Sequence, residues 1–162
     1  MELVAARPFK RLISTNQSYW HLESQLVTFL ATAEQTAGKY AMLELTIPRG
    51  YEPPPHTHSR ESESCYILDG EIEFTVGNNQ FIARKGDFVY LPKYVRHSIE
   101  IVTPSASALV FIEPAGLENF YLQTSRPAPE PSLPPRPSGP IPQELVDNMQ
   151  WLLKKEYGID TR

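Results

Sequence analysis

Short segments rich in β-branched and aromatic residues recur along most of the chain and are separated by turn-forming residues. The clearest is Glu71–Val76, where Ile72, Phe74 and Val76 fall on one face and polar residues on the other. Such alternation is typical of a half-buried strand. The same criteria predict strands over residues 19–22, 26–30, 39–47, 64–68, 80–83, 88–91, 97–102 and 108–112. Many short strands at this spacing predict an all-β fold, an antiparallel sandwich or small barrel.

The pattern changes after Phe120, and a proline-rich arm begins. Eight of the sixteen prolines lie between Arg126 and Gln143, where missing amide donors and fixed φ angles exclude a central strand or a helix interior. A helix is predicted after the arm, because Pro142 suits a first turn and Gly158 suits a C-terminal cap. The helix has an apolar stripe formed by Leu145, Met149, Leu152 and Leu153. This stripe must pack on the barrel or on a partner subunit.

The chain is therefore divided into three parts. Residues 38–120 are interpreted as the barrel, residues 1–37 as N-terminal strands that pack on the barrel or on a partner, and residues 121–162 as the arm with its helix. The additional strands and the arm exceed what a barrel needs, which predicts a homodimer.

Charge and composition narrow the function classes. The net charge of −4 argues against nucleic-acid binding, and no apolar run approaches the length of a membrane span. Cys65 is the only cysteine, and residues 1–8 lack the features of a secretion signal. A cytoplasmic protein is expected. Cys65 itself is interpreted as a packing residue rather than a nucleophile.

Three of the four histidines form a pattern that indicates a metal site. His56 and His58 are two residues apart, so both can face the same side of a strand, and His97 follows a later turn. Glu61 and Glu63 have equal strand parity, and either could add a carboxylate once a bulge or turn interrupts residues 59–62. Three imidazoles and a carboxylate suit a divalent transition metal and leave room for another ligand.

The complete spacing resembles the two sequence motifs of the cupin superfamily. The first reads Gly50-x5-His56-x-His58-x4-Glu63-x6-Gly70, and the second reads Gly86-x5-Pro92-x4-His97. The resemblance covers roughly residues 39 to 114. Tyr94 and Ile101 depart from the second motif, where a glycine and an asparagine are common. The C-terminal tail is similar to that of small single-domain cupins described as quercetin dioxygenase-like.

The resemblance implies a fold and a site. The fold is a cupin-type double-stranded β-helix, a jelly-roll barrel, with a metal held near one mouth by His56, His58, Glu63 and His97. The metal is one of iron, manganese, nickel, cobalt, copper or zinc. Glu63 has a possible catalytic role as well, because it can stay a ligand or accept a proton. Strand parity counted from the ligands, with further aromatic residues, predicts an apolar substrate pocket lined by Cys65, Ile67, Phe74, Phe88, Ile99, Ile101 and Phe111.

An apolar pocket around a metal suits a small organic compound that chelates through oxygen atoms. The resemblance makes dioxygenase chemistry the leading expectation. The alternatives are a non-oxidative metal-dependent isomerase or decarboxylase, and a non-catalytic cupin that binds a small molecule or metal. His21, the histidine outside the motifs, is expected at the surface or an interface.

Overall fold

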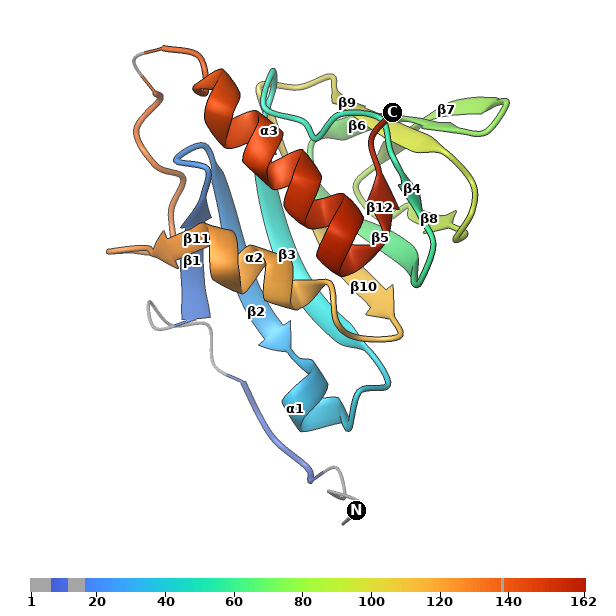
Figure 1. The fold of residues 1–162 in the computed structure, drawn as a ribbon, viewed down its shortest axis with the longest axis vertical. Helices are drawn as coiled ribbons and strands as arrows, with labels where there is room; N and C mark the ends of the chain where they lie inside the picture. Colours follow the sequence, from blue (N-terminus) through green and yellow to red (C-terminus); the bar gives the residue numbers. More distant parts are fainter. Residues whose placement is uncertain (1–6, 12–16, 138) are drawn as a thin grey trace.

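Antiparallel strands build most of the computed structural model, which describes residues 7–11, 17–137 and 139–162 (Figure 1). The large sheet has seven strands in the order β11 (Ser125–Pro127), β1 (Ser18–His21), β2 (Gln25–Ala31), β3 (Ala41–Pro48), β10 (Ser105–Glu113), β5 (Ser62–Asp69) and β8 (Phe88–Leu91). The second sheet has the order β7 (Asn79–Arg84), β6 (Glu71–Val76) and β9 (His97–Ile101). A further pair joins β12 (Ile159–Asp160) to β4 (Thr57–His58).

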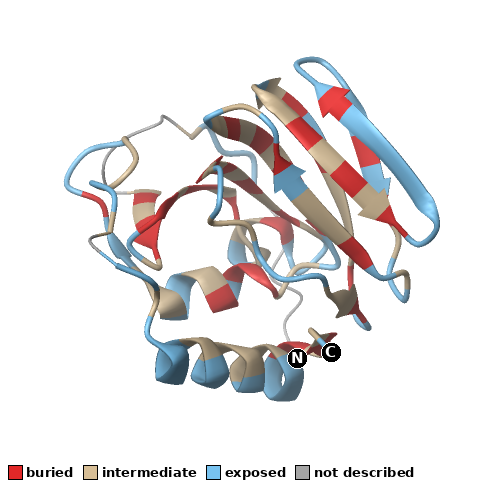
Figure 2. Ribbon diagram, turned by 90° about the horizontal axis from the view of Figure 1, so that it is seen from above, coloured by how far each residue is buried: buried red, intermediate tan, exposed pale blue. Residues whose placement is uncertain are grey.

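The core lies on the inner faces of these sheets, as the alternating apolar residues require. In β3 the buried positions alternate strictly with partly exposed ones, and Leu43 is fully buried. Ile67, Phe74, Ile101 and Ile112 are likewise almost completely buried. Figure 2 shows the buried residues as bands that repeat along the strands. The predicted all-β, antiparallel jelly-roll fold is confirmed.

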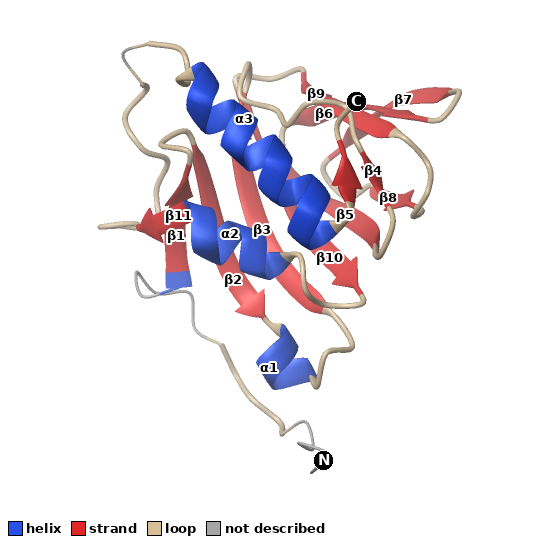
Figure 3. Cartoon of the chain, in the orientation of Figure 1, coloured by secondary structure: helices blue, strands red, loops and turns tan. Residues whose placement is uncertain are grey.

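The predicted C-terminal helix is present. Helix α3 (Gln143–Leu152) continues into one π-helical turn, η2 (Leu153–Tyr157), and ends at Gly158 with φ of +69°. Of the apolar stripe, Met149, Leu152 and Leu153 pack against the core of the same chain, and Leu145 stays exposed. Figure 3 shows α3 in front of the large sheet, beside a second helix, α2 (Glu118–Thr124).

Helix α2 and the short helix α1 (Ala33–Thr36) were not predicted from the sequence. Buried Glu118 connects them, because its two carboxylate oxygens accept the backbone N–H groups of Ala33 at 2.8 Å and Gly116 at 2.6 Å. Phe120, in the same helix, packs into the core. The carboxylate stabilises backbone donors on two segments distant in sequence, and a local pattern does not reveal such contacts.

The N-terminal strands extend the large sheet of their own chain. β1 pairs with β2 on one side and with β11 of the proline-rich arm on the other. The described part of this section therefore offers no unpaired strand at β1 to a partner. Residues 1–6 and 12–16 of the predicted N-terminal section, and residue 138 of the arm, lie outside the described residues. Within the described ranges, no helix has the length and hydropathy of a membrane span.

Candidate metal centre

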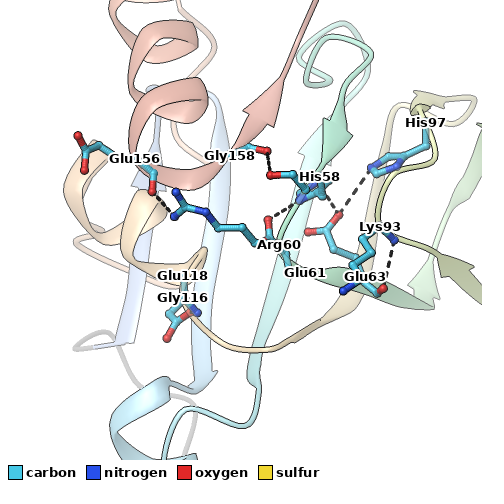
Figure 4. A network of polar contacts seen from close by, with 12 residues as sticks. His58, Arg60, Glu61, Glu63, Lys93, His97, Gly116, Glu118, Glu156 and Gly158 are labelled. Carbon is cyan, nitrogen blue, oxygen red and sulfur yellow. Dashed lines mark hydrogen bonds and ion pairs between the residues drawn. The ribbon is translucent and has the colours of Figure 1, made fainter.

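His56, His58, Glu63 and His97 meet inside the barrel. One ligand atom from each of the four residues lies within 4.8 Å of all the others. The Glu63 carboxylate is 3.4 Å from His58 Nε2 and 3.8 Å from His97 Nε2, as Figure 4 shows. His58 and His97 are only 2% and 4% exposed. The structure thus brings together the four residues that the sequence assigned to a metal.

Backbone hydrogen bonds hold the three histidines in register. His56 and His97 exchange both backbone bonds, with N···O distances of 3.0 and 2.9 Å, and so form an isolated antiparallel bridge. His58 lies on the short strand β4, which pairs with β12. The carbonyl oxygen of His58 accepts the backbone N–H of Tyr94 at 2.7 Å. Two segments some forty residues apart therefore place their imidazoles side by side.

A bend at residues 59 and 60 brings Glu63 to the histidines, as the odd offset from His58 requires. Contacts with the C-terminal segment stabilise the bend. Ser59 donates from its backbone N–H and its hydroxyl to the carbonyl oxygen of Gly158, at 3.1 and 2.7 Å. The guanidinium of Arg60 donates to the carbonyl oxygen of Glu156.

Each imidazole uses Nδ1 in a hydrogen bond and leaves Nε2 available as a ligand atom. His56 Nδ1 donates to the carbonyl of Pro54 at 2.8 Å, and His97 Nδ1 to that of Val95 at 3.2 Å. His58 Nδ1 bonds the carboxylate of Glu61 at 2.5 Å. The Nε2 atoms of His58 and His97 are buried and have no partner. Because buried polar atoms are normally paired, this donor set fits a bound cation.

The protonation states of His56 and His97 agree with this fit. Burial, with the neighbouring imidazoles, lowers the pKa of His56 to about 3, and burial lowers that of His97 to about 4. Both are therefore neutral at pH 7, as metal ligation requires. Burial opposes the charged form of His58, but the carboxylates of Glu63 and Glu61 outweigh it and raise its pKa. Burial raises the pKa of Glu63.

Glu61, the alternative carboxylate of the sequence analysis, supports the cluster from outside the ligand set. It is 4% exposed, and its carboxylate holds the Nδ1–H of His58. Strand parity could not separate Glu61 from Glu63. In the structure the two carboxylates reach opposite sides of the same imidazole, with Glu61 at Nδ1 and Glu63 at Nε2.

Replacing Glu61 by Gln is expected to weaken metal binding about 10- to 100-fold, the range found when an outer carboxylate that orients a ligating histidine is lost. The carboxamide keeps the size but removes the charge that fixes the imidazole. Competition with a chelator of known affinity measures the change. Glu73, a partly exposed residue of β6 outside the cluster, offers a control for the loss of one carboxylate, as Glu73→Gln. Equal affinity of Glu61→Gln and the wild type would contradict this role.

The cluster opens into an apolar cavity of about 740 Å³. Of the predicted pocket residues, Cys65, Phe74, Ile99 and Ile101 line it. Burial, together with the charge of Glu63, raises the pKa of the Cys65 thiol, which agrees with a packing role. Ile67 is fully buried in the core and does not reach the cavity wall.

Phe88 and Phe111 lie outside the cavity. Phe88 pairs with Tyr66 across β8 and β5, both side chains point outward, and Phe88 is 66% exposed. Phe111 stacks on Tyr40 with ring centroids 4.8 Å apart on the outer face of the sheet. Leu91 and Val110, on the opposite faces of the same strands, line the cavity. Strand alternation excludes the two phenylalanines once the register is known.

His21, Gln25 and Tyr121 are among the cavity residues that were not found from the sequence. His21, expected at the surface or an interface, is 3% exposed, and its ring lies 5.1 Å from that of Tyr121. Burial and the charge of Glu63 raise the pKa of Tyr121. Gln25 lies on the same strand face as buried Val27. A polar residue on a buried face was the signal that could have indicated its place in the cavity. Tyr121 lies on unpredicted α2.

The C-terminal segment closes one side of the cavity. Ile141, Met149, Leu153 and Ile159 contribute to its lining, so the arm, the helix and β12 all contact the enclosed space. Deletion of this segment would expose the apolar wall.

His21 makes the stability of the fold sensitive to acid. Burial lowers its pKa to about 4, so the unfolded chain binds more protons than the folded chain between pH 4 and 6.5. Stability is therefore lost as the pH falls through this window, and at pH 5 His21 contributes a loss of about 2 kcal/mol.

Chemical unfolding of the wild type and of His21→Phe at pH 7 and pH 5 measures this effect. The drop in unfolding free energy between the two pH values is expected to be about 2 kcal/mol smaller in the variant. The ligand histidines contribute equally to both proteins. An identical drop would show that His21 is not the group responsible.

Comparisons with known proteins agree with the site and the fold. A family model described as "Cupin domain" matches residues 43–113. Quercetin 2,3-dioxygenase of Bacillus subtilis is 22% identical over 120 residues, which cover 74% of this chain and 36% of the enzyme. An uncharacterised protein of Methanocaldococcus jannaschii is 36% identical over 62 residues, covering 38% of this chain and 50% of that protein. The chain thus spans half or less of the length of these relatives.

Similar solved structures include an RmlC-like cupin from Shewanella frigidimarina, with a TM-score of 0.58 and 14% identity over 71% of this chain and 99% of that one. KdgF from a Halomonas species has a TM-score of 0.53 and 17% identity, covering 59% and 85%. A predicted oxalate decarboxylase from Thermotoga maritima has a TM-score of 0.52 and 25% identity, covering 56% and 80%. The motif spacing, the barrel and these matches lead to one conclusion: residues 43–113 of the chain form a cupin domain.

Proposed function

We propose that this cupin is a metal-dependent dioxygenase acting on a small, largely apolar compound that chelates through oxygen atoms. The observation that carries the proposal is the convergence of three imidazoles and one carboxylate within 4.8 Å at the wall of an apolar cavity. His56, His58, Glu63 and His97 would hold the ion. Four protein ligands on an ion that accepts five or six leave coordination positions for a substrate.

The cavity favours a ligand without a second charged group. Most of its lining is aliphatic or aromatic, and no lysine or arginine of the described residues contributes to it. The carboxylate of Glu52, which also lines the cavity, accepts the backbone N–H groups of Gly50 and Ile101, each at 2.9 Å. An additional carboxylate or phosphate on the ligand would therefore meet no counter-charge. The ligand class that fits is an enol or phenol whose oxygen atoms approach the metal cluster.

When bound, a redox-active ion would supply Lewis acidity and electron transfer with dioxygen. The residues of the chain have separate tasks. Glu63, whose pKa burial raises, is placed to accept the proton that an enol or phenol loses. The apolar wall around it excludes water and strengthens electrostatic interactions at the site. Tyr121 lines the same cavity and is close enough to Glu63 to respond to its charge.

The test combines elemental analysis with oxygen consumption. Protein from its native host is expected to contain about one transition metal ion per chain and to consume oxygen with flavonols or other chelating enols. Glu63→Gln should retain part of the metal and lose turnover, because the carboxamide can coordinate weakly but cannot take a proton. Metal-replete protein that consumes no oxygen with any of these compounds refutes the dioxygenase proposal.

A non-oxidative decarboxylase or isomerase is the second candidate, and the similarity to the predicted oxalate decarboxylase supports it. Such chemistry on a small dicarboxylic acid needs a cation for the second carboxylate, and the described cavity lining lacks one. A non-catalytic cupin that only binds a small molecule is the third. Product analysis under anaerobic conditions separates the second candidate from both others.

A homodimer remains a proposal of its own. Strand β8 is an edge of the large sheet, and its outward residues Phe88 and Tyr90 are 66% and 56% exposed, next to exposed Tyr66 on β5. Apolar side chains on an edge strand favour association. Sedimentation velocity over a range of concentrations is expected to show a dimer, and a concentration-independent monomer would refute it.

A further inference from the structure

The cavity contains a second polar group, separate from the metal cluster. His21 and Gln25 face each other directly in the pairing of β1 with β2. Both line the cavity, and they are 3% and 6% exposed. Neither belongs to the motif residues, and neither is needed to close the hairpin. Each of these two side chains uses one of its two polar atoms in hydrogen bonds within the protein.

The hydrogen bonds around His21 determine which of its ring atoms is free. Thr124 donates its hydroxyl proton to the carbonyl oxygen of Phe120 at 2.6 Å. The Thr124 hydroxyl oxygen lies 3.2 Å from His21 Nδ1 and can therefore only accept, so Nδ1 carries the proton. Ser125 Oγ is also 3.2 Å from Nδ1. A neutral imidazole protonated at Nδ1 presents an acceptor lone pair at Nε2, and neither of these two hydroxyl contacts involves Nε2.

Gln25 also presents an acceptor atom. Its side-chain Nε2 donates to the carbonyl oxygen of Tyr51 at 2.7 Å, which fixes the orientation of the carboxamide. The Oε1 atom is left without a hydrogen-bond partner among the described residues. Oε1 is thus a second acceptor, directly across the strand pair from His21.

We propose that His21 Nε2 and Gln25 Oε1 form an acceptor pair that binds hydroxyl groups of the ligand within the cavity. The inference rests on the proposed function for the chelating end of the ligand. It narrows the substrate class to hydroxylated, otherwise uncharged and largely apolar compounds, such as polyphenols. Tyr121 lines the same cavity, with its ring 5.1 Å from that of His21, and the charge of Glu63 contributes to its raised pKa.

The acceptor pair should discriminate between ligands. A compound without hydroxyl donors would leave both acceptors desolvated and unpaired, which lowers affinity by about 10-fold or more. A ligand with a carboxylate or phosphate beside the acceptor pair would meet two acceptors and no cation. Its affinity should be lower still.

Two probes test the pair: quercetin, which carries hydroxyl groups on all its rings, and 3-hydroxyflavone, which keeps the chelating enol alone. Each is titrated anaerobically into metal-loaded protein, and binding is followed by the flavonol absorbance. The wild type is expected to bind quercetin about 10-fold more tightly than 3-hydroxyflavone. His21→Phe and Gln25→Leu should each reduce this preference, and the double variant should abolish it. His21→Asn, which keeps an acceptor, should restore part of it.

Metal content and the unfolding free energy of each variant show that the site and the fold persist. Nitrogen NMR of the imidazoles adds a direct measurement, because His21 is expected as the tautomer protonated at Nδ1. A wild type that binds both flavonols equally, or a His21 ring protonated at Nε2, overturns the acceptor pair but leaves the proposed function standing. Preferential binding of quercetin without oxygen consumption would refute the dioxygenase and support the pair. Binding of neither flavonol overturns both.

Discussion

Replacing His97 by Ala is expected to leave purified protein with almost no metal. Loss of a residue that only orients a ligand lowers metal affinity by up to about 100-fold, and loss of a ligand itself should lower it further. His97 contributes a neutral imidazole whose Nε2 is buried without a partner and lies 3.8 Å from the carboxylate of Glu63. Its removal leaves two histidines and one carboxylate. Elemental analysis after dialysis against a weak chelator measures the loss.

The fold should survive this change better than the metal site does. The bridge between residues 56 and 97 consists of backbone hydrogen bonds, which alanine can also form. His21→Phe is the matched control, since it removes a buried histidine outside the cluster and should leave the metal content unchanged. Retention of a full complement of metal by His97→Ala would contradict the assignment of the site.

Gly158→Ala is expected to lower the unfolding free energy by about 2 kcal/mol or more, through the left-handed conformation and a steric clash. Gly158 has φ of +69°, and an added Cβ would lie 2.5 Å from Ser59 Oγ and 3.0 Å from Arg60 Nε. Both neighbours belong to the bend that follows His58. Equilibrium unfolding measures the loss, and metal affinity should fall with it because β4 is displaced.

Gly38→Ala separates the two causes. Gly38 has φ of +76°, close to that of Gly158, but nothing lies within 4 Å of an added Cβ. This variant should show the conformational cost alone and bind metal like the wild type. If Gly158→Ala loses no more unfolding free energy than Gly38→Ala, the close approach of Gly158 to the bend does not contribute to the effect.

The sequence predicted the fold class because its signals are local. Strict alternation in Glu71–Val76 and the prolines of the arm each determine their own segment. The histidines could be grouped because short-range spacing on one strand is informative and the family pattern supplied the distant His97. Residues whose place depends on other segments were missed or misplaced. Phe88 needed the register of β8 against β5, and Glu61 needed the exact path of the bend.

His21 and Tyr121 illustrate the same limit at the cavity. One lies in an N-terminal hairpin and the other in a helix after the barrel, and only the packed structure brings their rings together. No single segment contains the information that a buried neutral imidazole faces a ligand space. Alternation does mark Gln25 as a polar residue on a buried face, and that anomaly was the usable signal.

The pairing of β12 with β4 has a consequence for biosynthesis. The strand that carries His58 is completed by residues translated much later, since Ser59 and its partner Gly158 are 99 positions apart. A nascent chain can form the hairpins of the barrel early, but its ligand strand lacks one hydrogen-bonded neighbour until translation reaches Asp160. Stable loading of an ion is therefore expected only after this segment has been translated, and a chain that stops before it would carry all four ligands with strand β4 lacking its neighbour.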